Sequence, residues 1–290
     1  MTVAFAYDFG PGAGFGHQRR CAVIANALTD LNVRTREVQI EGAFAVEASV
    51  IFVDSYRTRA DDQAIYRAAN VVAVDDLARD LEVSMVIDPA PGATSAVHAR
   101  ATHALAGAQY ALVDPALKSL ETSDVSIAPK SVLVTTGASD DAGVGAQMAT
   151  RIAEAFPLLT VNLVVGPWGT RTVPPGVGLL ERANGLGADL ARTDIVVTAG
   201  GVALLEALCL GRPTVAVPIA VNQQANVAGV VARGAALTSD PIHICETVQR
   251  LVGSAVLRAQ ISESAMGLID GQGANRVARR IVNVCSELAI

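Results

Sequence analysis

Short apolar runs alternate along this chain with segments in which apolar residues recur every three or four positions. A short run is typical of a buried strand, and the longer spacing is typical of a helix with one buried face. Their alternation indicates parallel sheets covered by helices. In the first half of the chain, the expected strands span residues 2–8, 49–54, 70–75, 83–88 and 109–113.

A second series follows a polar stretch, residues 118–130, that has no clear periodicity. Its expected strands span residues 131–136, 160–165, 194–198 and 213–217. The expected helices span residues 142–155, 201–210, 222–233 and then about 243–253, 256–268 and 274–288. We therefore expect two α/β domains, 1–128 and 129–290, with the last helix packing back on the first domain.

Composition excludes several classes of protein. The longest apolar stretch, around 195–205, is too short to cross a bilayer. No signal-peptide pattern opens the sequence, so we expect a cytoplasmic protein without an integral membrane segment. The net charge is −6 and no Lys/Arg run is present, which argues against nucleic-acid binding. The 4 cysteines form no C-x-x-C pair, so we expect no structural zinc. We also expect no other metal, no cofactor and a monomer.

A glycine-rich turn follows the first expected strand and contains Gly14 and Gly16. Glycines allow a tight turn and a close backbone approach to an anion. His17 then opens a helix, where the helix dipole favours the neutral imidazole that a general base requires. Arg20 lies on the same side of that helix and is suited to a phosphate or carboxylate. A surface histidine and a solvated arginine are the alternatives at this stage.

Acidic side chains follow two other expected strands. Asp54 and Tyr56 stand at the end of one strand, and Asp76 stands at the end of another. Parallel strands bring their carboxyl ends to one edge of a sheet, so we expect these residues to converge with the His17 turn. For Asp76, helix capping is an equally good interpretation.

Two further turns join strands to helices in the second half. Gly200 and Gly201 precede the helix that carries Glu206. This pattern is suited to a diphosphate at the helix N-terminus, with Glu206 accepting hydrogen bonds from a ribose. Asn222 and Gln223 open the next helix at the same edge. Close strand–helix packing by the glycines and N-capping by Asn222 are the alternatives.

The turn after residues 131–136 carries Gly137 and Ser139, which offer backbone N–H groups and a hydroxyl. A donor bound between two such halves is the simplest interpretation. The other histidines, His98, His103 and His243, are isolated in the sequence and are read as structural or surface groups.

These segments together resemble a known family, the UDP-sugar hydrolases of pseudaminic acid biosynthesis and their spore-coat-polysaccharide relatives. The segments that carry the resemblance are GFGHQRRC, VDSY, VDD, LVTTGASD, DIVVTAGG, EALCLGRPTVAVPIAVNQ and ISESAMGLIDGQGANRV. The resemblance implies an α/β, GT-B-like fold with two Rossmann-like domains whose parallel sheets face a central cleft.

The resemblance also implies an activity. The substrate would be UDP-2,4-diacetamido-2,4,6-trideoxy-β-L-altropyranose, cleaved at the anomeric carbon without a metal to give UDP and the free sugar. His17 falls on the family's active-site histidine, and the residues on the segment that holds UDP are Gly200, Gly201, Glu206, Asn222 and Gln223. The chain departs from the family at Tyr7-Asp8, which lacks the usual Arg-x-Asp arginine, and at Val202, which replaces a serine or threonine.

Two other functions remain open from the sequence. One is a GT-B glycosyltransferase that uses a UDP-sugar donor and an acceptor other than water, in the synthesis of a cell-surface polysaccharide. The other is a non-catalytic nucleotide-sugar-binding protein, which the departures at Tyr7 and Val202 keep open.

Overall fold

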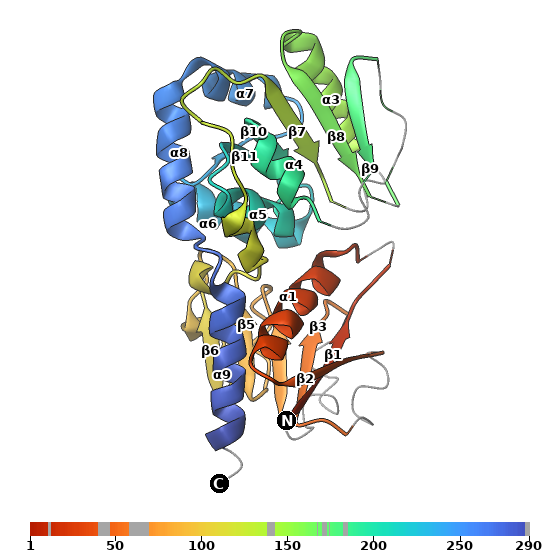
Figure 1. The fold of residues 1–290 in the computed structure, drawn as a ribbon, viewed down its shortest axis with the longest axis vertical. Helices are drawn as coiled ribbons and strands as arrows, with labels where there is room; N and C mark the ends of the chain where they lie inside the picture. Colours follow the sequence, from red (N-terminus) through yellow and green to blue (C-terminus); the bar gives the residue numbers. More distant parts are fainter. Residues whose placement is uncertain are drawn as a thin grey trace. The chain divides into compact units, whose positions relative to one another are not determined.

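The computed structural model describes residues 1–10, 13–39, 47–57, 70–137, 143–166, 168–169, 173, 175–181 and 185–287. The chain divides into two compact units. Unit 1 comprises Met1–Pro115 together with Gly271–Ile290, and unit 2 comprises Ala116–Asp270. Each unit is built on its own parallel sheet (Figure 1).

The sheet of unit 1 has six strands in the order β2-β1-β3-β4-β5-β6, all parallel. Its strands are β1 (Thr2–Tyr7), β2 (Arg34–Val38), β3 (Val50–Asp54), β4 (Val71–Val74), β5 (Met85–Asp88) and β6 (His103–Ala106). From β1 the chain passes first to β2 on one side and later to β3 on the other. The β1/β3 boundary is therefore a topological switch point, where open α/β sheets bind their ligands.

The interior strands of this sheet are apolar except at their ends, because both faces are covered. Every residue of β3 and β4 is buried. Helix α1 (Gly16–Asp30) covers one face with a buried stripe at helical spacing that includes Cys21, Ile24 and Leu28. His17 and Arg20 lie on the same buried stripe, so their side chains are directed to the sheet edge and not to solvent.

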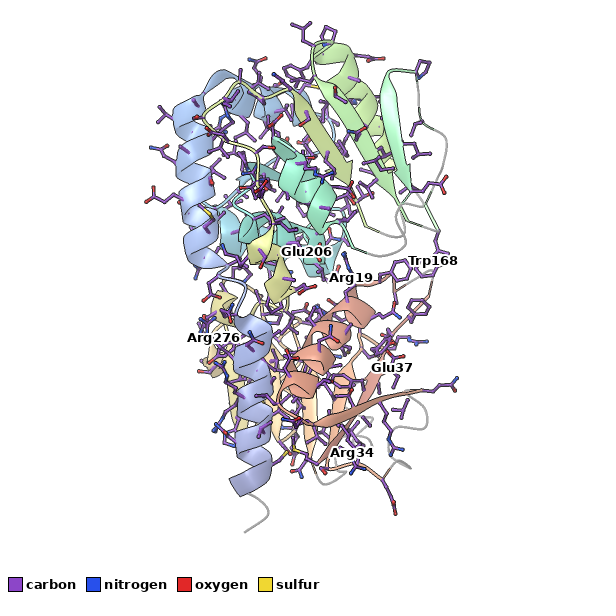
Figure 2. The ribbon with its side chains drawn as sticks, in the orientation of Figure 1. Arg19, Arg34, Glu37, Trp168, Glu206 and Arg276 are labelled. Atoms are coloured by element: carbon purple, nitrogen blue, oxygen red, sulfur yellow. The ribbon has the colours of Figure 1, made fainter. Side chains whose placement is uncertain are left out.

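The C-terminal helix α9 (Gly273–Glu287) belongs to unit 1 and lies beside α1 (Figure 1). Its residues Val277 and Ile281 join the same core cluster as Ile24 and Leu28. Arg276, labelled in Figure 2, donates from Nη1 to the carbonyl of Gln109 at 2.9 Å. The helix is thus attached to unit 1 by apolar packing and by a backbone contact.

The expected strand at 109–113 is wrong. The structure has a short 3₁₀ turn there, η3 (Ala108–Tyr110), and the strand of this region is β6, just before it. Residues 111–113 are apolar because α9 packs on them, and a side chain at Gly273 would collide with the backbone of Ala111.

The sheet of unit 2 also has six parallel strands, in the order β12-β11-β10-β7-β8-β9. Its strands are β7 (Ser131–Thr135), β8 (Thr160–Val165), β9 (Val177–Glu181), β10 (Ile195–Thr198), β11 (Thr214–Ala216) and β12 (Leu237–Thr238). The strand order reverses at β7, so the switch point lies between the ends of β7 and β10.

Helices cover the unit 2 sheet. They are α3 (Val144–Ala155), α4 (Gly187–Arg192), α5 (Val202–Cys209), α6 (Gln224–Val231), α7 (Ile244–Gly253) and α8 (Ala255–Leu268). Shorter 3₁₀ turns are η2 (Ser95–Val97) in unit 1, η4 (Pro115–Ser119) at the boundary and η5 (Val221–Gln223) in unit 2.

Two buried arginines attach residues 123–127 to unit 2. Arg212 donates to the carbonyls of Ser123 at 2.8 Å and Thr193 at 3.2 Å. Arg258 donates to the carbonyls of Val125 at 2.9 Å and Ile127 at 3.0 Å. These contacts explain why the division between the units falls at residue 115, ahead of this segment and ahead of the expected boundary at 128.

Candidate substrate site

The turn between β1 and α1 is closed by glycine. Gly10 and Gly14 form an isolated antiparallel bridge, and the N–H of Gly14 donates to the carbonyl of Gly10 at 2.8 Å. Gly14 has φ +70°, a left-handed conformation that side chains disfavour. Gly16 is the first residue of α1, and no side chain caps this helix. The turn therefore delivers His17 directly to the switch point of unit 1.

His17 is held by Asp54 from the end of β3. Its Nδ1 lies 2.6 Å from Oδ1 of Asp54, and both side chains are buried, at 3% and 1% exposed. Burial alone would raise the pKa of Asp54, but the charge of Arg20 and the hydrogen bonds from His17 and Arg20 hold that pKa below its ordinary value. An ionised carboxylate only accepts hydrogen bonds, so Nδ1 carries a proton, and in the neutral ring Nε2 keeps its lone pair.

Arg20 binds the same carboxylate through two parallel hydrogen bonds. Its Nε donates to Oδ2 of Asp54 at 2.8 Å, and its Nη2 donates to Oδ1 at 2.7 Å. Its Nη1 donates to Oδ2 of Asp76 at 2.8 Å. Burial would lower the pKa of Arg20, but the two carboxylates raise it well above its ordinary value. The guanidinium, expected to hold a ligand's phosphate or carboxylate, is therefore engaged by two aspartates of its own chain.

Tyr56 and Asp76 complete the cluster. The hydroxyl of Tyr56 donates to Oδ2 of Asp76 at 3.0 Å, and its ring meets the His17 ring edge-on at 4.5 Å between centroids. Burial raises the pKa of Tyr56 to about 12, which keeps the phenol neutral. The helix cap expected as an alternative for Asp76 is not seen, because a turn and no helix follows β4; in this turn Asp75 accepts the N–H groups of Leu77 and Arg79.

Asp8, at the end of β1, organises the turn that carries Tyr56. It accepts the hydroxyl of Ser55 at 2.7 Å, the N–H of Tyr56 at 3.0 Å and Nε of Arg57 at 2.7 Å. Burial raises the pKa of Asp8, but the bonds from Ser55 and Arg57 outweigh it and lower the value. The sequence analysis did not count Asp8 among the site residues, although its place at a strand end was a usable signal.

A second buried cluster lies at the ends of β4 and β5. His98 is 1% exposed, and its Nε2 lies 3.0 Å from Oδ2 of Asp88 while its Nδ1 lies 3.6 Å from Oδ2 of Asp75. The hydrogen bond to Asp88 raises the pKa of His98. Arg79 connects this cluster to the turn after β3, because its guanidinium binds Asp75 at 2.8 Å and the carbonyl of Ser55 at 2.9 Å.

The first turn of the unit 2 switch point follows β7. Gly137 has φ +104°, and its N–H donates to the hydroxyl of Thr135 at 3.4 Å. The carbonyl of Thr135 also accepts the N–H of Ala199 at 3.1 Å, which joins the turns after β7 and β10. The expected site residue Ser139 lies outside the described residues.

In the turn after β10, Gly200 and Gly201 differ. The N–H of Gly200 donates to Oε1 of Gln223 at 3.3 Å, and the same oxygen accepts the N–H of Ile219 at 3.0 Å. A Cβ at Gly200 would lie 2.7 Å from Cβ of Gln223 in η5 and 2.9 Å from Cγ2 of Val227 in α6, so this glycine lets the turn pack closely on the next helix. A Cβ at Gly201 would meet nothing within 4 Å. Asn226, which sequence reasoning missed, donates from Nδ2 to the carbonyl of Gly200 at 3.1 Å.

Gly201 is the N-cap residue of α5, and no side chain caps this helix. Glu206 lies in α5 and is buried; Figure 2 labels it in unit 2. Asn222 lies in η5 and is half-buried. Helix α6 begins only at Gln224, with Gln223 as an N-cap whose side chain makes no capping bond, so N-capping by Asn222 is not seen.

Within the described part of the chain, no group of three or more His, Cys, Asp and Glu side chains is arranged to hold a metal ion. None of the described helices is both long enough and apolar enough to cross a membrane.

Comparison with known proteins gives one sequence relative. No protein-family model matches the chain. The spore coat polysaccharide biosynthesis protein SpsG of Bacillus subtilis is 28% identical over 110 residues, which are 36% of this chain and 32% of SpsG. The match thus spans about a third of each protein, and it is a similarity to part of SpsG only.

Solved structures resemble the chain along nearly its whole length. The spinosyn rhamnosyltransferase SpnG, complexed with spinosyn aglycone, has a TM-score of 0.67 at 15% identity, over 97% of this chain and 100% of SpnG. The calicheamicin glycosyltransferase CalG4 has 0.64 at 16%, over 100% and 99%. MnaA of S. aureus, in a co-structure with UDP, has 0.68 at 14%, over 98% of both chains. These likenesses show the fold, and the GT-B-like expectation is confirmed.

Proposed function

We propose that this chain is a nucleotide-sugar enzyme that transfers the sugar of a UDP-sugar to an acceptor hydroxyl. The observation that carries the proposal is the buried contact of 2.6 Å between Nδ1 of His17 and Oδ1 of Asp54 at the unit 1 switch point. A histidine whose Nδ1 proton is held by a carboxylate presents Nε2 as a general base. The fold shared with SpnG and CalG4 supports the reaction class.

The chemistry is a displacement at the anomeric carbon. Nε2 of His17 takes the proton of the acceptor hydroxyl while the oxygen of that hydroxyl forms a bond to the anomeric carbon. The bond from the carbon to the phosphate oxygen breaks, and UDP leaves with the electron pair. Uncapped backbone N–H groups at the start of α5 are suited to the charge that grows on UDP. Taken by themselves, the turns after β7 and β10 of unit 2 are suited to a nucleotide, with Glu206 on its ribose.

Water as the acceptor is the second candidate. The segments GFGHQRRC, VDSY and VDD, which carry the resemblance to the UDP-sugar hydrolases, supply His17, Asp54, Tyr56 and Asp76 of the buried cluster. In that case water takes the place of the acceptor hydroxyl, and the products are UDP and a free N-acetylated deoxysugar of the pseudaminic type.

The test measures UDP release from a panel of UDP-N-acetylated sugars in ¹⁸O-labelled water, with and without sugar and polysaccharide acceptors. Wild type is compared with His17→Ala and with His243→Ala, which removes an exposed histidine of unit 2. We expect turnover that requires an acceptor and His17 and is unaffected by His243→Ala. Acceptor-independent release with ¹⁸O in the sugar identifies the hydrolase. UDP binding with no turnover on any acceptor, or full activity in His17→Ala, contradicts the proposal.

A further inference from the structure

Arg20 sets the geometry of the pair formed by His17 and Asp54. Its Nε and Nη2 hold the two oxygens of Asp54 at 2.8 and 2.7 Å, so the carboxylate cannot rotate without breaking both bonds. In this orientation Oδ1 of Asp54 points at Nδ1 of His17. Arg20 is itself fixed by Asp76 at 2.8 Å and is 7% exposed.

The same arginine also lies directly against the imidazole. Its Nη2 is 3.0 Å from Nδ1 of His17. Nδ1 cannot both donate to Asp54 and accept from Arg20, because it has a single in-plane position for a proton or a lone pair. Two lone pairs 2.6 Å apart would repel, so the proton lies between His17 and Asp54. The Arg20 contact is then one of a cation with the ring and not a hydrogen bond.

The charges around the imidazole can be counted. From α1 come Arg20 and Cys21, from β3 and the turn after it come Asp54 and Tyr56, and from the turn after β4 comes Asp76. Burial raises the pKa of Cys21 well above its ordinary value and that of Tyr56 to about 12, so both are neutral. Asp54 and Asp76 are the anions and Arg20 is the only cation among these described groups, so Arg20 is the charged partner that the two carboxylates share.

We propose that Arg20 is a positioning residue for His17: by fixing both oxygens of Asp54, it locks the Nδ1–H tautomer of the imidazole. The inference rests on the proposed function where it makes Nε2 the base. Its structural part stands without that assignment, because the tautomer of His17 is measurable without any substrate. Sequence spacing suggested a ligand contact for Arg20, and the structure gives this residue an internal role.

The test is ¹⁵N NMR of the histidine side chains, with the His17 signals assigned from His17→Ala. In wild type we expect the Nδ1–H tautomer alone. Arg20→Gln removes the two bonds that orient the Asp54 carboxylate, so the Nε2–H tautomer should appear beside it. Asp54→Asn removes the ionised acceptor of the Nδ1 proton, so His17 should also lose the single tautomer. Arg19→Gln removes the neighbouring arginine of α1 (Figure 2) and should leave His17 unchanged.

Arg20→Gln leaves Asp54 and Asp76 without their guanidinium partner. If this variant does not fold, Arg20→Lys carries the test, because a lysine keeps the charge but cannot bind both oxygens of Asp54 in parallel. An Nε2–H tautomer in wild type, or an Arg20 variant that keeps the Nδ1–H tautomer alone, overturns the inference. Failure of the proposed function looks different: the tautomers change as expected, but His17→Ala retains turnover. If His17→Ala loses turnover but the Arg20 variant keeps the wild-type His17 tautomer, only the role of Arg20 is contradicted.

Discussion

The carboxylate of Asp8 accepts the backbone N–H of Tyr56 at 3.0 Å, which ties the end of β1 to the turn after β3. The same turn presents the Tyr56 ring to His17. Asp8 lies outside the cluster of His17, Arg20 and Asp54, but through this turn it positions the Tyr56 ring that contacts His17.

Asp8→Ala should lower the free energy of unfolding by about 1–3 kcal/mol, because buried donors of Ser55 and Tyr56 lose their acceptor. Urea denaturation measures the change. Arg57→Gln is the matched control, since Arg57 binds Asp8 from a side chain that is 68% exposed, and an exposed ion pair contributes about 0–1 kcal/mol. Equal losses in the two variants would mean that Asp8 acts only through Arg57.

Gly200→Ala and Gly201→Ala form a second matched pair. A Cβ at Gly200 would lie 2.7 Å from Cβ of Gln223 and 2.8 Å from its carbonyl oxygen. The variant should lose about 1–3 kcal/mol by overpacking and bind UDP more weakly, because η5 must move. Gly201→Ala has open space at φ −92° and should cost less. Denaturation and UDP titration calorimetry check both, and equal effects would place the constraint elsewhere.

A third prediction concerns Arg258, which is 3% exposed and donates to the carbonyls of Val125 and Ile127. Arg258→Met should cost about 1–3 kcal/mol because these acceptors are left unpaired. The variant should also be cleaved faster at residues 123–127 in limited proteolysis. Arg250→Met, at an exposed position of α7, controls for the loss of a positive charge. Unchanged cleavage in Arg258→Met would show that other contacts retain the segment.

The strands that could be predicted from the sequence share one property. All eight interior strands, four in each sheet, coincide with expected apolar runs. The missed strands β2, β6, β9 and β12 are the four sheet edges. Edge strands are buried on fewer sides, so β2 reads Arg-Thr-Arg-Glu-Val and has no residue that is fully buried. The apolar run at 109–113 was wrongly predicted to be a strand for the opposite reason: it is apolar because helix α9, from the far end of the chain, covers it.

The candidate site shows a similar division. Strand-end position and helical spacing suffice to group His17 and Arg20 with Asp54, Tyr56 and Asp76, because parallel strands share one carboxyl edge. They do not tell which partner each side chain takes. Arg20 binds two aspartates 34 and 56 positions away, and Gln223 braces Gly200 through its side-chain oxygen. His98 looked isolated because its partners Asp75 and Asp88 follow different strands.

His98 gives a stability prediction with a defined sign. Its folded-state pKa is raised by Asp88, so its contribution to folding is fully present below the unfolded pKa of about 6.5 and is lost as pH rises through the folded value. The difference in unfolding free energy between wild type and His98→Gln should therefore be largest near pH 6 and shrink at alkaline pH. Urea denaturation from about pH 5.5 to about pH 9, a range that spans an ordinary histidine titration, measures this difference as a function of pH. His243→Gln breaks an exposed pair with Asp240 and should change stability little across this range. A difference for His98→Gln that stays constant with pH would show that His98 is held neutral between its two carboxylates.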